Sequence, residues 1–263
     1  MKIIDMHTHV FPDAIAEKTM AFLSEKAGVK PFLNGTVADL KRSMDAAGIA
    51  VSVNQPIATT PSQVVSINNW ALGIQDERIV SFGSLHPQFE GIDEELGRIK
   101  GLGIRGVKLH PDYQRFHPDE EAVFPLYEAL IRHDMIALFH AGVDIGLYPP
   151  MYGTPQRIAR VLDIFPAMTI VAAHLGGYDC WDEVEQYLVG KRVFLDTSYV
   201  IDHMEQAWLV RIMREHGFDR ILFATDSPWK RQDEEVRKIA ALPIPERAKE
   251  DVLSGNAGRL LQR

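Results

Sequence analysis

The amino-acid sequence predicts a (β/α)8 barrel, or TIM barrel, that forms one α/β domain over residues 1–263. Eight short runs rich in Val, Ile and Phe recur along the chain with helical stretches between them, as a series of βα units requires. Several runs are almost continuously apolar, which is typical of parallel strands buried on both faces. We expect strands at residues 2–7, 49–56, 79–85, 104–110, 135–140, 169–174, 193–198 and 221–226.

The segments between these runs carry helix signals at their ends. We expect helices within residues 36–48, 119–134, 154–166 and 245–261. Thr36 and Thr154 are suited to cap the first turns of two of them, and Gly48 is suited to end one. Pro125 lies inside the second segment, where it indicates a kink or a later helix start. The last segment is predicted to form one or two helices with an interruption at Ser254–Gly255.

A doubly wound open sheet is the alternative architecture for alternating strands and helices. Such sheets commonly carry a Gly-rich phosphate-binding turn after their first strand. None of the expected strands is followed by that pattern, and no Gly/Ser linker or low-complexity tract divides the chain. The sequence therefore favours a single barrel domain.

Composition and charge argue against several classes of protein. Apolar residues are 46% of the chain, enough for a large core, and the formal net charge is -8 with scattered basic residues. This balance argues against a nucleic-acid or anionic-membrane surface, and no apolar run reaches the ~18–20 residues that span a bilayer. One cysteine excludes an intramolecular disulfide. Because the strand pattern begins at once, we expect no signal peptide and a cytoplasmic protein.

Residues that bind metals or move protons stand at the ends of five expected strands. The active sites of barrels lie at the carboxyl ends of the strands, where the βα loops begin. The residues at these ends are His7 and His9, Lys108 and His110, His140, His174, and Asp226. The chain has ten histidines in all, so their gathering at strand ends is not expected by chance.

The spacing of His7 and His9 predicts a metal site. Strand side chains alternate with period 2, so both imidazoles share one face, with Asp5 one step deeper on it. Three imidazoles and a carboxylate suit Zn²⁺, with Mn²⁺ or Fe²⁺ as alternatives. We therefore predict a divalent ion held by His7, His9, His140 and Asp226. The alternative for each residue is a solvated strand edge or a buried, hydrogen-bonded polar side chain.

Other polar residues are predicted to act around this ion. We expect His174 to be a general acid or base, and Asp226 also to accept a proton from metal-activated water. The residues predicted to bind substrate are Lys108, His110 and His86. Asp5 is suited to orient a ligand histidine. The structural alternatives are an ion pair at the barrel mouth for Lys108 and a turn-associated hydrogen bond for His174.

Several motifs make the chain similar to a known superfamily. The stretches "DMHTH", "FHAG", "AHLGG", "ATDSP" and "GNAGRLL" resemble those of the amidohydrolase superfamily, and they run from Asp5 to Leu261. More narrowly, the chain resembles the amidohydrolase-related (amidohydrolase-2) group, which includes metal-dependent decarboxylases such as aminocarboxymuconate-semialdehyde decarboxylase. The resemblance implies the metal ligands His7, His9 and His140, with Asp226 as a ligand or proton acceptor and His174 as a catalytic residue. Members with two metals often bridge them with a carboxylated lysine, and Lys108 stands at such a position.

The sequence leaves three functions open. The first is a metal-dependent hydrolase, in which metal-activated water attacks a small amide, lactone or ester. The second is a carboxy-lyase that uses the same ion to hold a carboxylated substrate. The third is a metal-stabilised barrel that binds a ligand without catalysis. We expect a small-molecule substrate and no nucleic-acid or membrane partner, and we leave a homodimer open.

Overall fold

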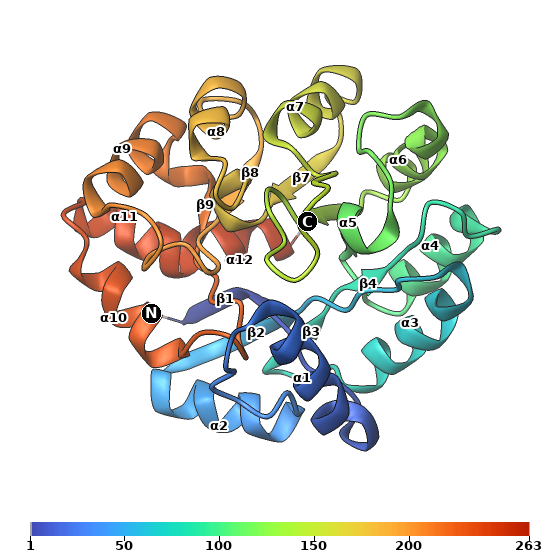
Figure 1. Ribbon diagram of the computed structural model, residues 1–263, viewed down its shortest axis with the longest axis horizontal. Helices are drawn as coiled ribbons and strands as arrows, with labels where there is room; N and C mark the ends of the chain where they lie inside the picture. Colours follow the sequence, from blue (N-terminus) through green and yellow to red (C-terminus); the bar gives the residue numbers. More distant parts are fainter. Residues whose placement is uncertain (1, 263) are drawn as a thin grey trace.

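The computed structural model describes residues 2–262, which form a ring of parallel strands surrounded by helices (Figure 1). The strands are β1 (Ile3–Thr8), β2 (Ile49–Asn54), β3 (Ile79–Ser81), β4 (Gly83–Ser84), β5 (Gly106–Leu109), β6 (Ile136–Phe139), β7 (Thr169–Ala172), β8 (Phe194–Asp196) and β9 (Ile221–Leu222). Neighbouring strands pair in parallel, in the order β1-β2-β3 and in the order β4 to β9. The predicted (β/α)8 barrel is confirmed.

The third expected strand, residues 79–85, is divided into β3 and β4 at Phe82. The Phe82 N–H donates to Asn54 O at 2.9 Å, so the chain stays beside β2 across the break. At the other seam, between β1 and the residues after β9, Asp226 N donates to His7 O at 2.9 Å. These contacts join the two sheets into one closed barrel.

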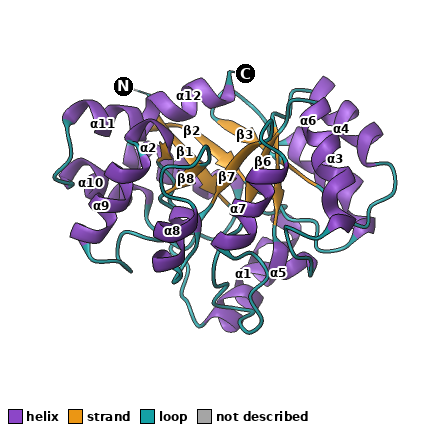
Figure 2. Cartoon of the chain, turned by 90° about the horizontal axis from the view of Figure 1, so that it is seen from above, coloured by secondary structure: helices purple, strands orange, loops and turns teal. Residues whose placement is uncertain are grey.

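Helices cover the outside of the strand ring, while α1 and α5 lie at one end of it and α12 lies at the other (Figures 1 and 2). They are α1 (Asp13–Ala27), α2 (Val37–Ala47), α3 (Val64–Gly73), α4 (Ile92–Gly101), α5 (Pro111–Gln114), α6 (Phe124–Arg132), α7 (Pro155–Ile164), α8 (Trp181–Tyr187), α9 (Gln206–His216), α10 (Gln232–Ala241), α11 (Glu246–Glu250) and α12 (Asn256–Leu261). Within residues 2–262, none of the helices has the length and apolar character needed to cross a membrane.

The helix ends at Thr36, Gly48 and Thr154 follow the predicted signals. The side chains of Thr36 and Thr154 each accept a hydrogen bond of 3.2 Å from the backbone N–H three residues later. Pro125 lies in the first turn of α6, so it marks a later start and not a kink. The expected interruption at Ser254–Gly255 takes the form of a π-helical stretch, Asp251–Gly255, which separates α11 from α12 while the chain stays helical.

Two apolar clusters hold the barrel together. The larger cluster includes Leu40 and Met44 of α2 and packs helices against the outer face of the strands. The smaller cluster takes side chains from separate strands and from α12: Met6, Val53, Phe82, Leu138, Val171, Leu222, Ala257 and Leu260 are among its members. This cluster fills the barrel interior, as in other TIM barrels, and leaves the polar strand ends at the opposite mouth.

Candidate metal centre and active-site cavity

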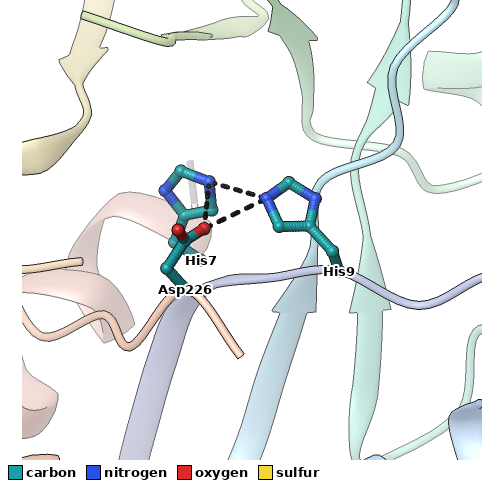
Figure 3. A group of neighbouring side chains, drawn as sticks. All are labelled: His7, His9 and Asp226. Carbon is teal, nitrogen blue, oxygen red and sulfur yellow. Dashed lines mark hydrogen bonds and ion pairs between the residues drawn. The ribbon is translucent and has the colours of Figure 1, made fainter. Parts of the chain in front are cut away.

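Two histidines and an aspartate converge at the carboxyl end of the barrel, and we call them the His7/His9/Asp226 triangle (Figure 3). His7 lies in β1, His9 follows it, and Asp226 follows β9. The Nε2 atoms of His7 and His9 are 3.2 Å apart, and Asp226 Oδ1 lies 3.6 Å from the first and 3.2 Å from the second. Donor atoms about 2.0–2.2 Å from a tetrahedral ion stand about 3.3–3.6 Å apart. The triangle therefore has the dimensions of a metal centre.

The second ring nitrogen of each histidine is held by an acceptor. His7 Nδ1 lies 2.9 Å from Asp196 Oδ2, and His9 Nδ1 lies 2.9 Å from Gln55 O. Carboxylate and carbonyl oxygens only accept, so both Nδ1 atoms carry the proton and both Nε2 atoms present lone pairs. Two lone pairs and a carboxylate oxygen thus face one another, an arrangement that a cation stabilises.

Burial of His7 and the neighbours of Asp226 keep these two groups in the protonation states that bind a metal. Burial, followed by the charge of Lys108, lowers the pKa of His7 well below its ordinary value. Burial alone would raise the pKa of Asp226, but its contact with His9 and the neighbouring histidines outweigh that effect and hold the pKa below its usual range. Neutral imidazole and ionised carboxylate are the forms that coordinate a metal.

His140 belongs to a second group of side chains, with His110 and Asp144. One donor atom of each lies within 4.8 Å of the others, and His110 Nε2 is 3.3 Å from Asp144 Oδ2. The His110 and His140 rings are stacked, with centroids 4.1 Å apart and planes 9° apart. A metal ion lies in the plane of an imidazole that binds it, so these parallel rings do not share an ion without a ring rotation. The predicted role of His140 as a ligand beside His7 and His9 stays a prediction.

His174 connects His140 to the backbone after β8. Its Nδ1 lies 3.0 Å from Ser198 O, and its Nε2 lies 3.1 Å from His140 Nδ1. Because the carbonyl accepts from Nδ1, His174 Nε2 is an acceptor and His140 Nδ1 is the donor. The remaining His140 Nε2 is buried without a hydrogen-bond partner among residues 2–262. The hydrogen-bonded histidines therefore leave the lone pair of His140 Nε2 without a hydrogen-bond donor among residues 2–262.

Asp196, at the end of β8, is a site residue that the motifs do not reveal. Its Oδ2 accepts from His7 Nδ1, and its Oδ1 accepts from His174 N at 3.0 Å. The second bond helps hold His174 at a φ of 58°, a region that non-glycine residues enter only where their surroundings impose it. A signal exists, because Asp196 lies near the end of the expected strand 193–198. Asp144 lies in a loop, where the sequence offers no comparable signal.

Lys108 is fully buried beside the triangle, with Nζ 3.1 Å from His7 Nε2. Within the described part of the chain, no carboxylate oxygen lies within 4.0 Å of this amine. Burial lowers the pKa of Lys108 to about 8, against the opposing charges of Asp196 and Asp226. A buried amine without an acid partner is suited to bind an anionic or carbonyl oxygen of a ligand.

The three residues predicted to bind substrate fall in different places. Lys108 and His110 line the same cavity as the triangle. Among the described residues that line it, His86 is absent, and its Nδ1 accepts from Gln88 N at 3.2 Å. His86 is therefore placed as a turn residue rather than as a cavity residue.

Asp5 does not share the inner face with His7, contrary to the expected alternation. Its Oδ2 accepts from Gln232 Nε2 of α10 at 2.8 Å, on the helix side of β1. The register of β1 against β2 shifts between Asp5 and Thr8, and strict alternation requires a regular strand. Asp5 accepts from the backbone N–H of His7 at 3.2 Å, so it holds the chain and not the ring.

The site opens into a cavity of about 650 Å³, within the range of small-molecule sites. Its polar lining includes the triangle, Lys108, His110, His140 and His174. The other walls come from α1, α3 and the loop at residues 143–146. The predicted ligand and catalytic residues, with Lys108 and His110 but without His86, thus line one chamber with room for a substrate.

Solved structures with the same fold match almost the whole chain. An uncharacterised TIM-barrel protein from Bordetella bronchiseptica has a TM-score of 0.76 and 22% identity, over 100% of this chain and 99% of that chain. A dihydroxybenzoic acid decarboxylase from Polaromonas sp. JS666, solved with bound manganese and the inhibitor 2-nitroresorcinol, has a TM-score of 0.75 and 19% identity. That match covers 99% of this chain and 97% of the decarboxylase. At these identities the likeness establishes the fold.

Sequence comparison is more specific about the family. A dihydroorotase from Shewanella halifaxensis (strain HAW-EB4) is 28% identical over 102 residues, which are 35% of this chain and 29% of that protein. The match thus spans less than a third of the dihydroorotase. The family model described as amidohydrolase matches residues 4–263, nearly the full sequence. The chain belongs to the amidohydrolase family.

Proposed function

We propose that this chain is a metal-dependent hydrolase acting on the carbonyl group of a small amide, lactone or ester. The observation that carries the proposal is the convergence of two Nε2 lone pairs, from His7 and His9, with the Asp226 carboxylate. Two imidazoles and one carboxylate form a common catalytic Zn²⁺ site and also suit Mn²⁺ or Fe²⁺. Zn²⁺ is the proposed ion, and His140 remains a proposed additional ligand because its Nε2 lone pair has no partner among residues 2–262.

An ion held there supplies Lewis acidity and lowers the pKa of a water molecule. The protein groups around it then divide the remaining tasks. Lys108 binds an oxygen of the substrate, since its buried amine lies 3.1 Å from His7 Nε2. Asp226 accepts a proton from the attacking water. That proton then passes by way of His174 to the leaving nitrogen or oxygen as its bond to carbon breaks.

Decarboxylation is the second candidate reaction, and Lys108 is the observation that favours it. Its buried ammonium has no carboxylate within 4.0 Å in the described chain, which suits it to pair with a substrate carboxylate. The likeness to the dihydroxybenzoic acid decarboxylase supports this reaction on the same scaffold. Here the C–C bond to the carboxylate breaks, CO₂ leaves, and a proton from solvent, relayed by His174, replaces it on carbon.

Two further expectations from the sequence, a cytoplasmic location and a possible homodimer, stay predictions.

Metal analysis combined with product analysis tests both reactions. The purified protein is stripped with a chelator, reloaded separately with Zn²⁺, Mn²⁺ or Fe²⁺, and incubated with panels of amides, lactones, esters and aromatic carboxylic acids. Hydrolysis products that depend on the ion support the hydrolase, whereas metal-dependent release of CO₂ supports the carboxy-lyase. Full activity after stripping contradicts both. Tight metal binding without turnover of any panel would instead support a non-catalytic binding barrel.

A further inference from the structure

Helix α1 presents an apolar face to the active-site cavity. The residues of α1 that line the cavity share one face of the helix and are Ile15, Thr19, Phe22, Leu23, Lys26 and Ala27. Ile15 and Phe22 remain 50% and 53% exposed, while the buried residues Ala16 and Met20 lie on the adjacent face. Figure 2 shows α1 on the side of the strands opposite to α12, which is the side of the polar strand ends. The exposed face of α1 is thus part of the site and not of the core.

A second apolar wall faces the same chamber. Ile67 and Trp70 of α3 line the cavity one helical turn apart, and the loop after β6 adds Val143 and Ile145. Ile145 is itself 43% exposed. Apolar side chains that stay in contact with water around a concave site are a common mark of ligand binding.

Charge is unevenly distributed over the cavity lining. Apart from the histidines at the strand ends, the charged lining residues in the described chain are Lys108, Asp144 and Asp226 near the strand ends, and Lys26 on α1. Lys26 Nζ lies 5.3 Å from the Phe22 ring centroid, over an aromatic face. The chamber therefore has a polar floor and predominantly apolar walls.

The volume exceeds what a small polar substrate needs. A cavity of roughly 150 Å³ accommodates a benzene molecule, and this chamber measures about 650 Å³. A compact carbonyl compound on the polar floor would leave the walls of α1 and α3 in contact with water. An elongated amphipathic ligand would cover both regions at once.

We propose that the substrate carries a carboxyl or carbonyl head, which lies at the strand ends, and an extended apolar body, which lies between α1 and α3. The placement of the carboxyl or carbonyl head at the strand ends rests on the proposed function. The apolar body restricts the substrates to amphipathic compounds. The volume accommodates a body of roughly eight to twelve carbons, either as an acyl chain or as linked aromatic rings. Phe22 and Ile15 then act as specificity-determining residues at the outer end of the site.

A binding series tests the proposal without turnover. Zn²⁺-loaded protein is titrated calorimetrically with straight-chain carboxylates from butanoate to dodecanoate, and separately with benzoate and biphenyl-4-carboxylate. Burial of each methylene group is expected to raise affinity about three- to four-fold until the chamber is filled. A steep rise along the acyl series alone identifies an acyl body, and a rise from benzoate to biphenyl-4-carboxylate alone identifies an aromatic one. An affinity that does not change with length in either series overturns the proposal.

Matched substitutions locate the binding surface. Phe22→Ser and Ile15→Ser should each weaken the longest tight-binding ligand of the favoured series at least five-fold and leave butanoate or benzoate unchanged. Phe32→Ser and Ile164→Ser are the controls, because these side chains are 57% and 49% exposed and do not line the cavity. Equal losses in test and control variants would contradict the proposal. So would a Phe22→Ser variant that changes the oligomeric mass in sedimentation yet keeps the long-ligand affinity, since α1 would then be a self-association surface.

The two proposals can fail separately. If no hydrolysis or decarboxylation is found but affinity rises with length and falls in Phe22→Ser, the proposed reaction is wrong and the apolar site stands. If metal-dependent turnover is found with a flat length dependence, the reaction stands and the apolar site is wrong.

Discussion

The Nε2 atoms of His7 and His9 lie 3.2 Å apart, although neither carries a proton that could bond the other. Asp196 and the Gln55 carbonyl accept the proton of the opposite nitrogen in each ring. Two facing lone pairs repel, and Asp226 adds a negative charge beside them. Lys108 Nζ lies 3.1 Å from His7 Nε2 on one side of this group, and the convergence of the three acceptor atoms is suited to a divalent cation.

Replacing His9 with alanine should abolish stoichiometric metal binding. One of the three donors of the triangle is lost, and two donors hold a divalent ion poorly. Inductively coupled plasma mass spectrometry should give about one ion per chain for the parent and close to none for His9→Ala. His133→Ala is the control, because His133 lies on the surface beside Asp93 and away from the site. Unchanged metal content in His9→Ala would contradict the triangle.

Asp196→Asn should weaken metal affinity about 10–100-fold, as loss of a carboxylate that orients a ligand histidine typically does. The amide lacks the charge that fixes the His7 ring and cannot accept with both side-chain atoms. Competition with a fluorescent chelator measures the change. Asp163→Asn, at an exposed aspartate paired with Lys191, should leave the affinity unchanged. Equal metal affinities in the two variants would show that Asp196 does not orient His7 for metal binding.

Lys108→Met should preserve the first metal ion and weaken the binding of substrates that carry an anionic head. A charge-assisted hydrogen bond contributes about 1.5–3 kcal/mol, so KM should rise roughly 10- to 100-fold with a smaller change in kcat. Steady-state kinetics and metal content are measured on the same preparation. A parent with two ions per chain, reduced to one in Lys108→Met, would show instead that the lysine bridges metals as a carbamate.

His174→Asn should keep the metal and lose turnover. The asparagine removes the ring that bonds His140 Nδ1, so the proposed proton transfer is interrupted, at a cost of roughly 10²- to 10⁴-fold in kcat. Circular dichroism and metal analysis establish that the fold and the ion remain. If turnover on every active substrate stays at the parent level, a barrel that only binds its ligand becomes the better description.

The single thiol should react slowly at neutral pH. Burial raises the pKa of Cys180 to about 11, and nearby acids add to the shift. The thiolate is the reactive form, so at pH 8 alkylation by iodoacetamide should be on the order of 100-fold slower than for an ordinary thiol of pKa about 8.5. Mass spectrometry should show the rate rising about ten-fold per pH unit from 8 to 10. A plateau near pH 9, as expected for the urea-unfolded chain, would disprove the shift.

The strand ends could be predicted because each is a local pattern. A buried apolar run that ends in a histidine or an aspartate is visible within six or seven residues, and barrel geometry brings those ends together. The same locality explains the failure at Asp5. The register shift between Asp5 and Thr8 depends on pairing with β2, which the residues of β1 do not encode by themselves.

The roles of Asp196 and α1 were missed for a different reason. Asp196 contacts the His7 ring because closure of the barrel brings β8 beside β1. The residues 193–198 do not by themselves indicate that His7 will be the partner. Helix α1 has its apolar residues on the cavity face, so the usual relation between helix periodicity and core packing does not describe it. The apolar residues of α1 serve the binding cavity, so their positions do not follow the pattern expected for a helix that packs only on the core.

The seam of the barrel lies at the triangle itself. His7 and His9 belong to the first strand and its exit, Asp226 follows the last strand, and Asp226 N donates to His7 O across the join. During synthesis on the ribosome, the donor set is incomplete until the last strand has left the exit tunnel. Metal loading therefore reports that the ring has closed, and a chain cut short before Asp226 would hold two of the three donors without their partner.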